Sequence, residues 1–61
     1  MAKLLLSVPE AAEALSISRA KLYRLMGDGE IPYLHIDRSR RIPLSALENY
    51  VSDLLAKERA A

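Results

Sequence analysis

The chain has 61 residues, no cysteine and a formal net charge of +1. This length allows one small domain and leaves little room for a closed substrate pocket. The lack of cysteine excludes disulfides and thiolate metal sites, and the apolar run at residues 4–6 is too short for a signal peptide or a membrane span. We expect a single domain over residues 1–61, in the cytoplasm and without a membrane partner.

The charges are unevenly distributed along the chain. Residues 16–43 carry six basic side chains against three acidic ones, whereas residues 1–15 and 44–61 each have one more acidic side chain than basic. A localised excess of positive charge is typical of proteins that bind the phosphate backbone of nucleic acids. The distribution therefore indicates a nucleic-acid partner for the middle of the chain.

A first helix is predicted over residues 8–15. Ser7 and Glu10 have the spacing of a capping box, in which each side chain accepts a hydrogen bond from the other residue's backbone N–H. Pro9 falls in the first turn, where its missing N–H costs nothing. Apolar residues recur at helical spacing on one face, at Val8, Ala11, Ala12 and Leu15.

A second helix is predicted over residues 18–28, after a turn of only three residues. Ser18 is a suitable N-cap, and Gly29 can adopt the left-handed conformation that ends a helix. Two helices joined this closely must cross steeply, so we expect Ala12 to supply the small side chain at their contact and Ile17 to fill the wedge between them. The two helices together predict a helix-turn-helix.

Residues 33–43 are predicted to form a β-hairpin that serves as a wing. Residues 33–36 alternate between aromatic or polar side chains and apolar ones, which is the period of a strand. Residues 37–40 are polar and typical of a turn. The return strand is expected at residues 41–42, and Pro43 should prevent it from extending.

A third helix is predicted over residues 45–56, followed by a frayed tail at residues 57–61 that has no apolar anchor except alanine. Its apolar stripe is too short to indicate a coiled coil. The stripe could form a dimer seam, but we expect it instead to close the core over the first helix and the hairpin. The exposed end, residues 55–61, is a candidate contact for a protein partner. The stripe consists of Leu44, Leu47, Val51 and Leu54.

This order of elements predicts a mainly α fold with a small β-hairpin, a winged helix-turn-helix. In that fold the second helix enters the major groove of double-stranded DNA, where arginine can hydrogen-bond to guanine. The hairpin can reach the adjacent backbone or the minor groove. The predicted DNA-binding residues are Ser18, Arg19, Lys21, Tyr23 and Arg24 on the helix and His35, Arg38, Arg40 and Arg41 on the hairpin.

Other interpretations of these residues stay open from the sequence alone. Tyr23 either contacts phosphate or packs against the wing, and Arg41 could instead form a salt bridge with Glu30 or Asp37. His35 is expected on the surface, and one histidine without cysteine provides no metal ligand set. No nucleophile–base pair and no phosphate-binding glycine loop is present, so we expect no enzyme activity, no catalytic residue and no cofactor.

Several short motifs follow one another in the order of a known family. The order and spacing of these motifs make residues 4–55 resemble the excisionase branch of the winged helix-turn-helix proteins. This branch is related to the MerR regulators. The motifs are Leu6-Ser7-Val8, Glu10-Ala11-Ala12, Leu22-Tyr23-Arg24-Leu25, Gly29-Glu30-Ile31-Pro32 and Arg41-Ile42-Pro43.

The resemblance implies a recombination directionality factor. Such proteins bind and bend DNA at attachment sites, and they direct a tyrosine recombinase (integrase) toward excision of a prophage or integrative element. Because the sequence has no long dimerisation helix, we expect a monomer when free that binds repeated sites cooperatively. The alternative is a small winged-helix transcriptional regulator; a protein-interaction module without DNA binding is disfavoured by the basic stretch.

Two positions depart from the family pattern. Ser16 stands where glycine is common, and we expect its φ to stay negative so that the fold tolerates serine. Asp37 stands where glycine is common in the wing, and its carboxylate opposes a close approach of the wing tip to phosphate.

Overall fold

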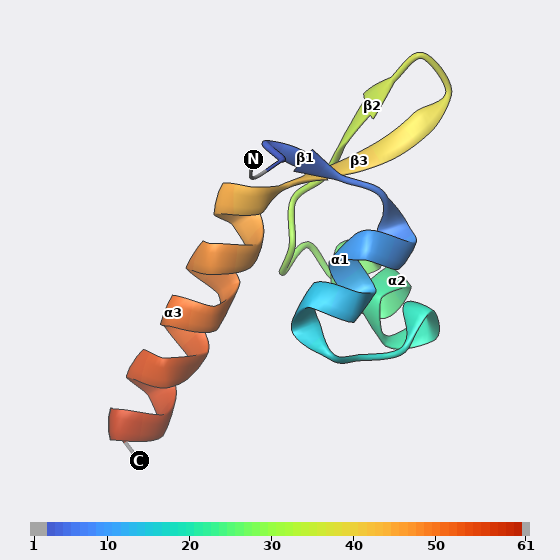
Figure 1. The fold of residues 1–61 in the computed structure, drawn as a ribbon. Helices are drawn as coiled ribbons and strands as arrows, with labels where there is room; N and C mark the ends of the chain where they lie inside the picture. The colour runs from blue at the N-terminus through green and yellow to red at the C-terminus, as the bar shows by residue number, and fades with distance from the viewer. Residues whose placement is uncertain (1–2, 61) are drawn as a thin grey trace.

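The computed structural model describes residues 3–60, which form three helices and a three-stranded antiparallel sheet (Figure 1). Helices α1 (Val8–Leu15) and α2 (Arg19–Gly27) form the helix-turn-helix, and strands β2 (Leu34–Ile36) and β3 (Ser39–Pro43) form the wing. The predicted fold class, a mainly α winged helix-turn-helix, is confirmed. In chain order the elements are β1 (Leu5–Leu6), α1 (Val8–Leu15), α2 (Arg19–Gly27), β2 (Leu34–Ile36), β3 (Ser39–Pro43) and α3 (Leu44–Ala60).

The capping box at the start of α1 is present as predicted. The Ser7 Oγ accepts a hydrogen bond from the Glu10 backbone N–H at 3.3 Å, and the Ser7 backbone N–H donates to Glu10 Oε1 at 3.0 Å. The Lys3 ammonium also donates to Glu10 Oε2. The Lys3 hydrogen bond, followed by those from Ser7, lowers the pKa of the Glu10 carboxyl from 4.5 to about 2. A charged carboxylate therefore sits at the positive end of the helix dipole.

The turn between α1 and α2 is a Schellman motif centred on Ser16. The Ser16 backbone N–H donates to the Glu13 carbonyl at 3.0 Å, and the Ile17 N–H donates to the Ala12 carbonyl at 3.0 Å. Ser16 is left-handed, with φ 57° and ψ 41°, so the expectation of a negative φ is wrong. The reason is geometric: these two hydrogen bonds can both form at the end of a helix only when the residue in the position of Ser16 is left-handed.

The core cluster includes the residues predicted at the contact between the two helices. Ala12 is buried, and Ile17 packs half-buried against the same cluster. Leu22 of α2 is fully buried in it. At the far end of α2, Gly29 has a φ of 79°, and the Glu30 N–H donates to the Leu25 carbonyl at 3.0 Å, so the predicted glycine ends the helix.

The sheet has the order β1-β3-β2, so β3 is its central strand. Strand β1, residues 5–6, was not predicted; two residues are too few to show a strand period. The wing turn is also shorter than predicted, because Ile36 pairs with Ser39 and only residues 37–38 form the turn. Asp37 makes this tight turn possible by adopting a φ of 57°, a conformation that aspartate tolerates better than most residues.

The core lies where the helix-turn-helix meets the base of the sheet. Its largest fully buried side chains are Leu22, Ile31 and Ile42. The backbone N–H of Leu44 donates to the carbonyl of Leu4 at 2.9 Å, which holds the start of α3 beside β1. The remaining buried residues are Val8, Ala11, Ala12, Leu25, Met26, Ala46 and Leu47.

Helix α3 differs from the prediction in two ways. It continues to Ala60, so the tail expected to fray from residue 57 is helical as far as the structure describes it; residues 57–60 are all helix formers, and Ala61 lies outside the described residues. The apolar stripe closes the core only at its start, because Leu47 is buried in the core, whereas Val51 and Leu54 are each 41% exposed. Figure 1 shows the reason: α3 leaves the sheet and diverges from α1 and α2. No helix within residues 3–60 has the length and apolarity needed to cross a bilayer.

Candidate nucleic-acid interface

Helix α2 turns one face to the core and leaves its basic face exposed. Leu22, Leu25 and Met26 are buried, and this spacing fixes the orientation of the helix. The Ser18 Oγ accepts the Lys21 backbone N–H at 3.1 Å and caps the helix, which uses the hydroxyl oxygen as an acceptor and leaves its hydrogen available. The predicted contact residues of α2 are all exposed: Ser18, Arg19, Lys21, Tyr23 and Arg24.

The register of the wing divides its side chains between two faces. His35 pairs with Arg40, and Leu34 pairs with Arg41. Because alternate residues of a strand point to opposite faces, Arg40 shares its face with the buried Ile42, so this face is directed toward the core side of the sheet. The opposite face carries Leu34, Ile36 and Arg41. Leu34 and Ile36 are 38% and 48% exposed, since this part of the hairpin extends beyond the core (Figure 1).

An arginine of the wing lies between two tyrosine rings. The Arg40 guanidinium carbon is 5.6 Å from the ring centre of Tyr23 on α2 and 5.5 Å from that of Tyr33 at the start of the wing. The Tyr33 and His35 rings meet edge to face, with centres 5.7 Å apart. Of the two interpretations of Tyr23, the structure has it packed against the wing, although its side chain remains about half exposed.

Tyr33 is a site residue that the sequence analysis missed. Its only signal in the sequence is its position two residues before His35, which places both rings on one face of the strand. That Tyr23 would meet the same arginine depends on the packing of α2 against the sheet, which no local pattern shows.

The charges of the interface are not neutralised by acidic neighbours. Arg41 is half-buried, and its guanidinium donates to the Arg40 carbonyl at 3.4 Å. Among residues 3–60 it forms no ion pair with Glu30 or Asp37, the alternative that the sequence left open. Within the same described range, no ion pair engages the basic side chains of Arg19, Lys21, Arg24, Arg38 and Arg40.

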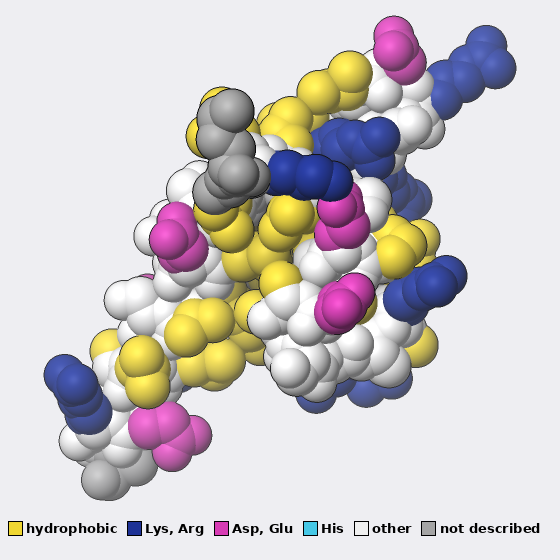
Figure 2. All heavy atoms as spheres, in the orientation of Figure 1, with side chains coloured by type: hydrophobic (Ala, Val, Ile, Leu, Met, Phe, Trp, Pro, Cys, Tyr) yellow, Lys and Arg dark blue, Asp and Glu magenta, His cyan; other side chains and the backbone are white. Residues whose placement is uncertain are grey.

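Figure 2 shows how these charges are distributed over one face of the molecule. Lys and Arg side chains project from the wing and around the outer edge of the α1–α2 unit, whereas hydrophobic side chains gather between this unit and α3. The structure thus brings Tyr23 and Arg40 together, with His35 beside Arg40 in the register of the hairpin. The other cations, Arg19, Lys21, Arg24 and Arg38, are exposed. The described residues contain no group of three His, Asp or Glu side chains that could hold a metal ion.

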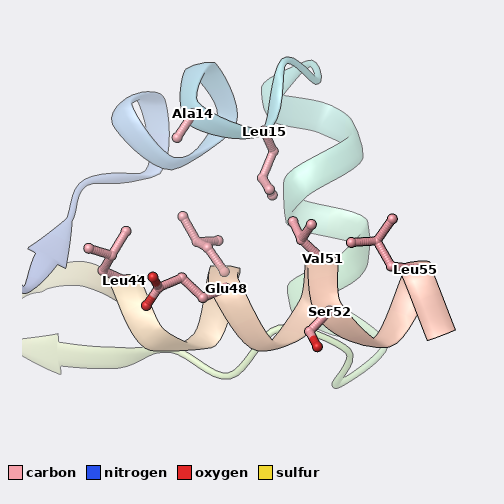
Figure 3. A pocket seen from close by; sticks show the side chains of 8 residues that line it. Ala14, Leu15, Leu44, Glu48, Val51, Ser52 and Leu55 are labelled. Carbon is pink, nitrogen blue, oxygen red and sulfur yellow. The ribbon is translucent and has the colours of Figure 1, made fainter.

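The hydrophobic region between α1 and α3 is a groove with a volume of about 410 Å³. In Figure 3, Leu15 of α1 points toward Val51 and Leu55 of α3 across this space. Val51 is 41% exposed and Leu55 is 55% exposed. The other residues that line the groove are Ala14, Leu44, Leu47, Glu48 and Ser52.

Comparison with known proteins identifies the family. Residues 5–54 match the model of a helix-turn-helix domain. The chain is 34% identical over 53 residues to an excisionase of Streptomyces ambofaciens, and the match covers 87% of this chain and 86% of that protein. The chain belongs to the excisionase family of helix-turn-helix proteins. This membership supports DNA binding and agrees with the expectation that the chain is not an enzyme.

Two further relatives are longer than this chain. A probable excisionase of Saccharopolyspora erythraea is 44% identical over 59 residues, and a putative antitoxin VapB50 of Mycobacterium tuberculosis is 45% identical over 56 residues. The matches cover 97% and 92% of this excisionase-family chain, but it spans only 60% and 43% of the lengths of those proteins. No solved structure matches the chain significantly.

Proposed function

We propose that this excisionase-family chain binds double-stranded DNA with α2 in the major groove and the wing on the adjacent backbone or minor groove. The observation that carries the proposal is the set of basic side chains on these two elements, none of which is neutralised by an ion pair within residues 3–60. Unpaired, exposed cations on a small domain favour the phosphate backbone, because binding releases the counterions condensed on it.

Helix α2 and the wing make different kinds of contact with the DNA in this proposal. Arg19 and Arg24 contact base edges from α2, since a guanidinium can donate to guanine O6 and N7 together. Ser18 and Lys21 lie at the start of α2 and hold the backbone, while Arg38 and Arg41 do so from the wing. Of the three remaining candidates, Arg40 lies over the Tyr23 ring, and His35 is paired with Arg40 across the hairpin.

We further propose that binding bends the DNA. Leu34 and Ile36 are exposed on the face of the wing that also carries Arg41. Apolar side chains that enter the minor groove can separate base steps and kink the duplex, with neighbouring arginines holding the phosphates. The outer face of the wing has this combination of side chains.

The bent complex directs a tyrosine recombinase toward excision of a prophage or integrative element, in keeping with the names of the excisionases that this chain is similar to. In this proposal the groove between α1 and α3 and the exposed end of α3, residues 55–60, contact the recombinase or a neighbouring copy on the DNA. Exposed apolar surface of this kind is typical of protein contacts. The protein acts in the cytoplasm, where its DNA substrate lies.

The second candidate function is a small transcriptional regulator that uses the same DNA-binding surface without a recombinase. The similarity to a putative antitoxin, which is not described as an excisionase, is the observation that favours it. A recombinase gene beside the gene for this chain would favour excision; an operon without one would favour regulation.

The decisive experiment combines two assays. DNA binding is measured by fluorescence anisotropy on the attachment-site region of the element and on shuffled DNA of the same composition. Excision is then measured with the neighbouring recombinase, with and without this protein. Specific binding together with protein-dependent excision is expected. Specific binding without any effect on excision would support the regulator, and equal binding to both DNAs would refute sequence-specific recognition.

A further inference from the structure

We propose that Arg40 is a positioning residue, which sets the angle between the wing and the recognition helix by stacking between Tyr23 and Tyr33. This differs from a direct phosphate contact, which its sequence position alone suggests. The inference deepens the proposed function and rests on it in one respect: α2 and the wing must engage the same DNA.

The geometry of the stack fits a pair of cation–π interactions. Both ring centres lie within 6 Å of the Arg40 guanidinium carbon, at 5.6 Å for Tyr23 and 5.5 Å for Tyr33, which is the range in which the quadrupole of the ring attracts a cation. The Tyr33 ring in turn meets the His35 ring edge to face, with ring centres 5.7 Å apart. One charge thus links a side chain of α2 to two aromatic side chains of the wing.

The wing has little else to fix its direction beyond its base. Strand β3 contacts β1, α1 and α3 near its root, where Ile42 is fully buried. Farther out, Leu34 and Ile36 on the opposite face are 38% and 48% exposed, so they hold the hairpin less firmly than a buried residue does. The Arg40 stack joins this outer part of the wing to α2, so it decides where Arg38 at the tip lies relative to the basic face of the helix.

Arginine suits this position better than lysine. A guanidinium is planar and weakly hydrated, so it can lie flat against aromatic faces, whereas an ammonium is a compact and strongly hydrated charge. A guanidinium engaged with two rings also has less freedom to reach a phosphate. Arg40→Lys therefore keeps the charge and removes the proposed positioning, which separates the two roles.

The test compares variants on attachment-site DNA at several salt concentrations. Arg40→Lys and Tyr33→Leu are each expected to lower the affinity by about tenfold, because loss of the stack releases the wing and its contacts. Tyr33→Phe is the matched control and should bind like the unaltered protein, since phenylalanine keeps the ring face. If Arg40 instead contacts phosphate directly, Arg40→Lys and Tyr33→Leu bind normally, and this result would overturn the proposal.

A double-mutant cycle between Tyr33→Leu and Arg38→Ala gives a second readout. Arg38→Ala alone should reduce the slope of log affinity against log salt by about one, because one phosphate contact is lost. In the Tyr33→Leu background the same change should have little effect, since a released wing no longer places Arg38 on the backbone. Fully additive effects would contradict positioning.

The stack can also be tested without DNA. In the free protein, ring currents from two tyrosines should shift the Arg40 δ-methylene protons upfield of those of Arg38, and Tyr33→Leu should reduce this shift with the other resonances preserved. Equal shifts for the two arginines would refute the stack. Normal ring-current shifts in a protein that binds no DNA would instead refute the proposed function and leave the stack intact.

Discussion

Leu6 and Ile42 lie opposite each other across the antiparallel pair of β1 and β3. Leu6 directly precedes the N-cap of α1, and Ile42 lies at the base of the wing, so the pairing joins these two parts of the fold. Ile42 is fully buried, and Leu6 packs half-buried against the same core. This pairing is therefore one of the contacts that hold the wing to the helix-turn-helix.

Truncation of a buried core side chain should unfold a large fraction of the protein molecules. Ile42→Ala, Leu22→Ala and Leu25→Ala are each expected to reduce the free energy of unfolding by about 2–5 kcal/mol, a large share for a domain of this size. The measurement is urea denaturation followed by circular dichroism. Leu34→Ala on the exposed wing is the control, with an expected change within about 0.5 kcal/mol. Similar losses for Ile42 and Leu34 would contradict the core described above.

The Glu10 capping box should make stability depend on acid pH. The pKa of Glu10 is lowered to about 2 in the folded chain, so its carboxylate favours the folded state above its ordinary pKa, and this contribution is lost as the pH falls from about 4.5 to 2. Glu10→Gln should lower the melting temperature at neutral pH, and its difference from the unaltered protein should shrink toward pH 2. Glu13→Gln, on the same helix outside the capping box, is the control. A difference that is constant over this pH range would contradict the assignment.

The left-handed backbone conformation of Ser16 should be strained, and a substitution by glycine should relieve this strain. Ser16→Gly is expected to increase the free energy of unfolding by about 1 kcal/mol, because glycine adopts a positive φ without steric cost. Ser16→Val should destabilise the chain, since a β-branched residue is strained there. Ser52→Gly in the regular part of α3 should have the opposite sign to Ser16→Gly and cost about 0.5 kcal/mol. If both glycine variants lose stability, the turn is not left-handed in solution.

Variants of the recognition helix should weaken specific DNA binding without affecting the fold. Arg19→Ala or Arg24→Ala is expected to cost about 1–3 kcal/mol of binding free energy on the attachment-site sequence and to reduce discrimination against shuffled DNA. Lys57→Ala at the far end of α3 is the charge-matched control and should bind normally. Unchanged affinity for both α2 variants would refute the placement of this helix in the major groove.

The groove beside α3 should act in assembly rather than in DNA contact. Leu55→Ser is expected to leave binding to a single site unchanged and to reduce cooperative binding to repeated sites or recombinase-dependent excision. Asn49→Ser, elsewhere on α3, is the matched control and should leave both unaffected. The free protein should sediment as a monomer at micromolar concentration. A stable dimer under those conditions, or full cooperativity in Leu55→Ser, would contradict this assignment.

Local sequence patterns were sufficient for the helix starts and for the overall fold class. Ser7 with Glu10, and Ser18 with Lys21, each satisfy backbone donors within four residues of chain. Gly29 ends α2 by its own conformational freedom. Such interactions form between residues that are close in the sequence. A sequence pattern that contains these residues therefore also predicts their contacts.

The positions of longer-range contacts were decided only by the tertiary structure. Strand β1 exists because β3 lies beside it, and the positive φ of Ser16 follows from the way α1 must end before α2. The apolar stripe of α3 has the spacing of a core face, yet most of it is exposed, because the helix diverges from α1. Periodicity shows which side chains share a face; it does not show whether another element lies against that face.

The same distinction applies to the candidate interface. The sequence by itself determined that basic residues gather on the second helix and the wing, and on the helix their spacing places them opposite the buried residues. Only the tertiary structure decided that Arg40, which remains exposed, lies over the rings of Tyr23 and Tyr33. Those rings are ten residues apart in the chain, and only the fold, which sets α2 and the wing in relation to each other, brings both of them to one guanidinium, at 5.6 and 5.5 Å.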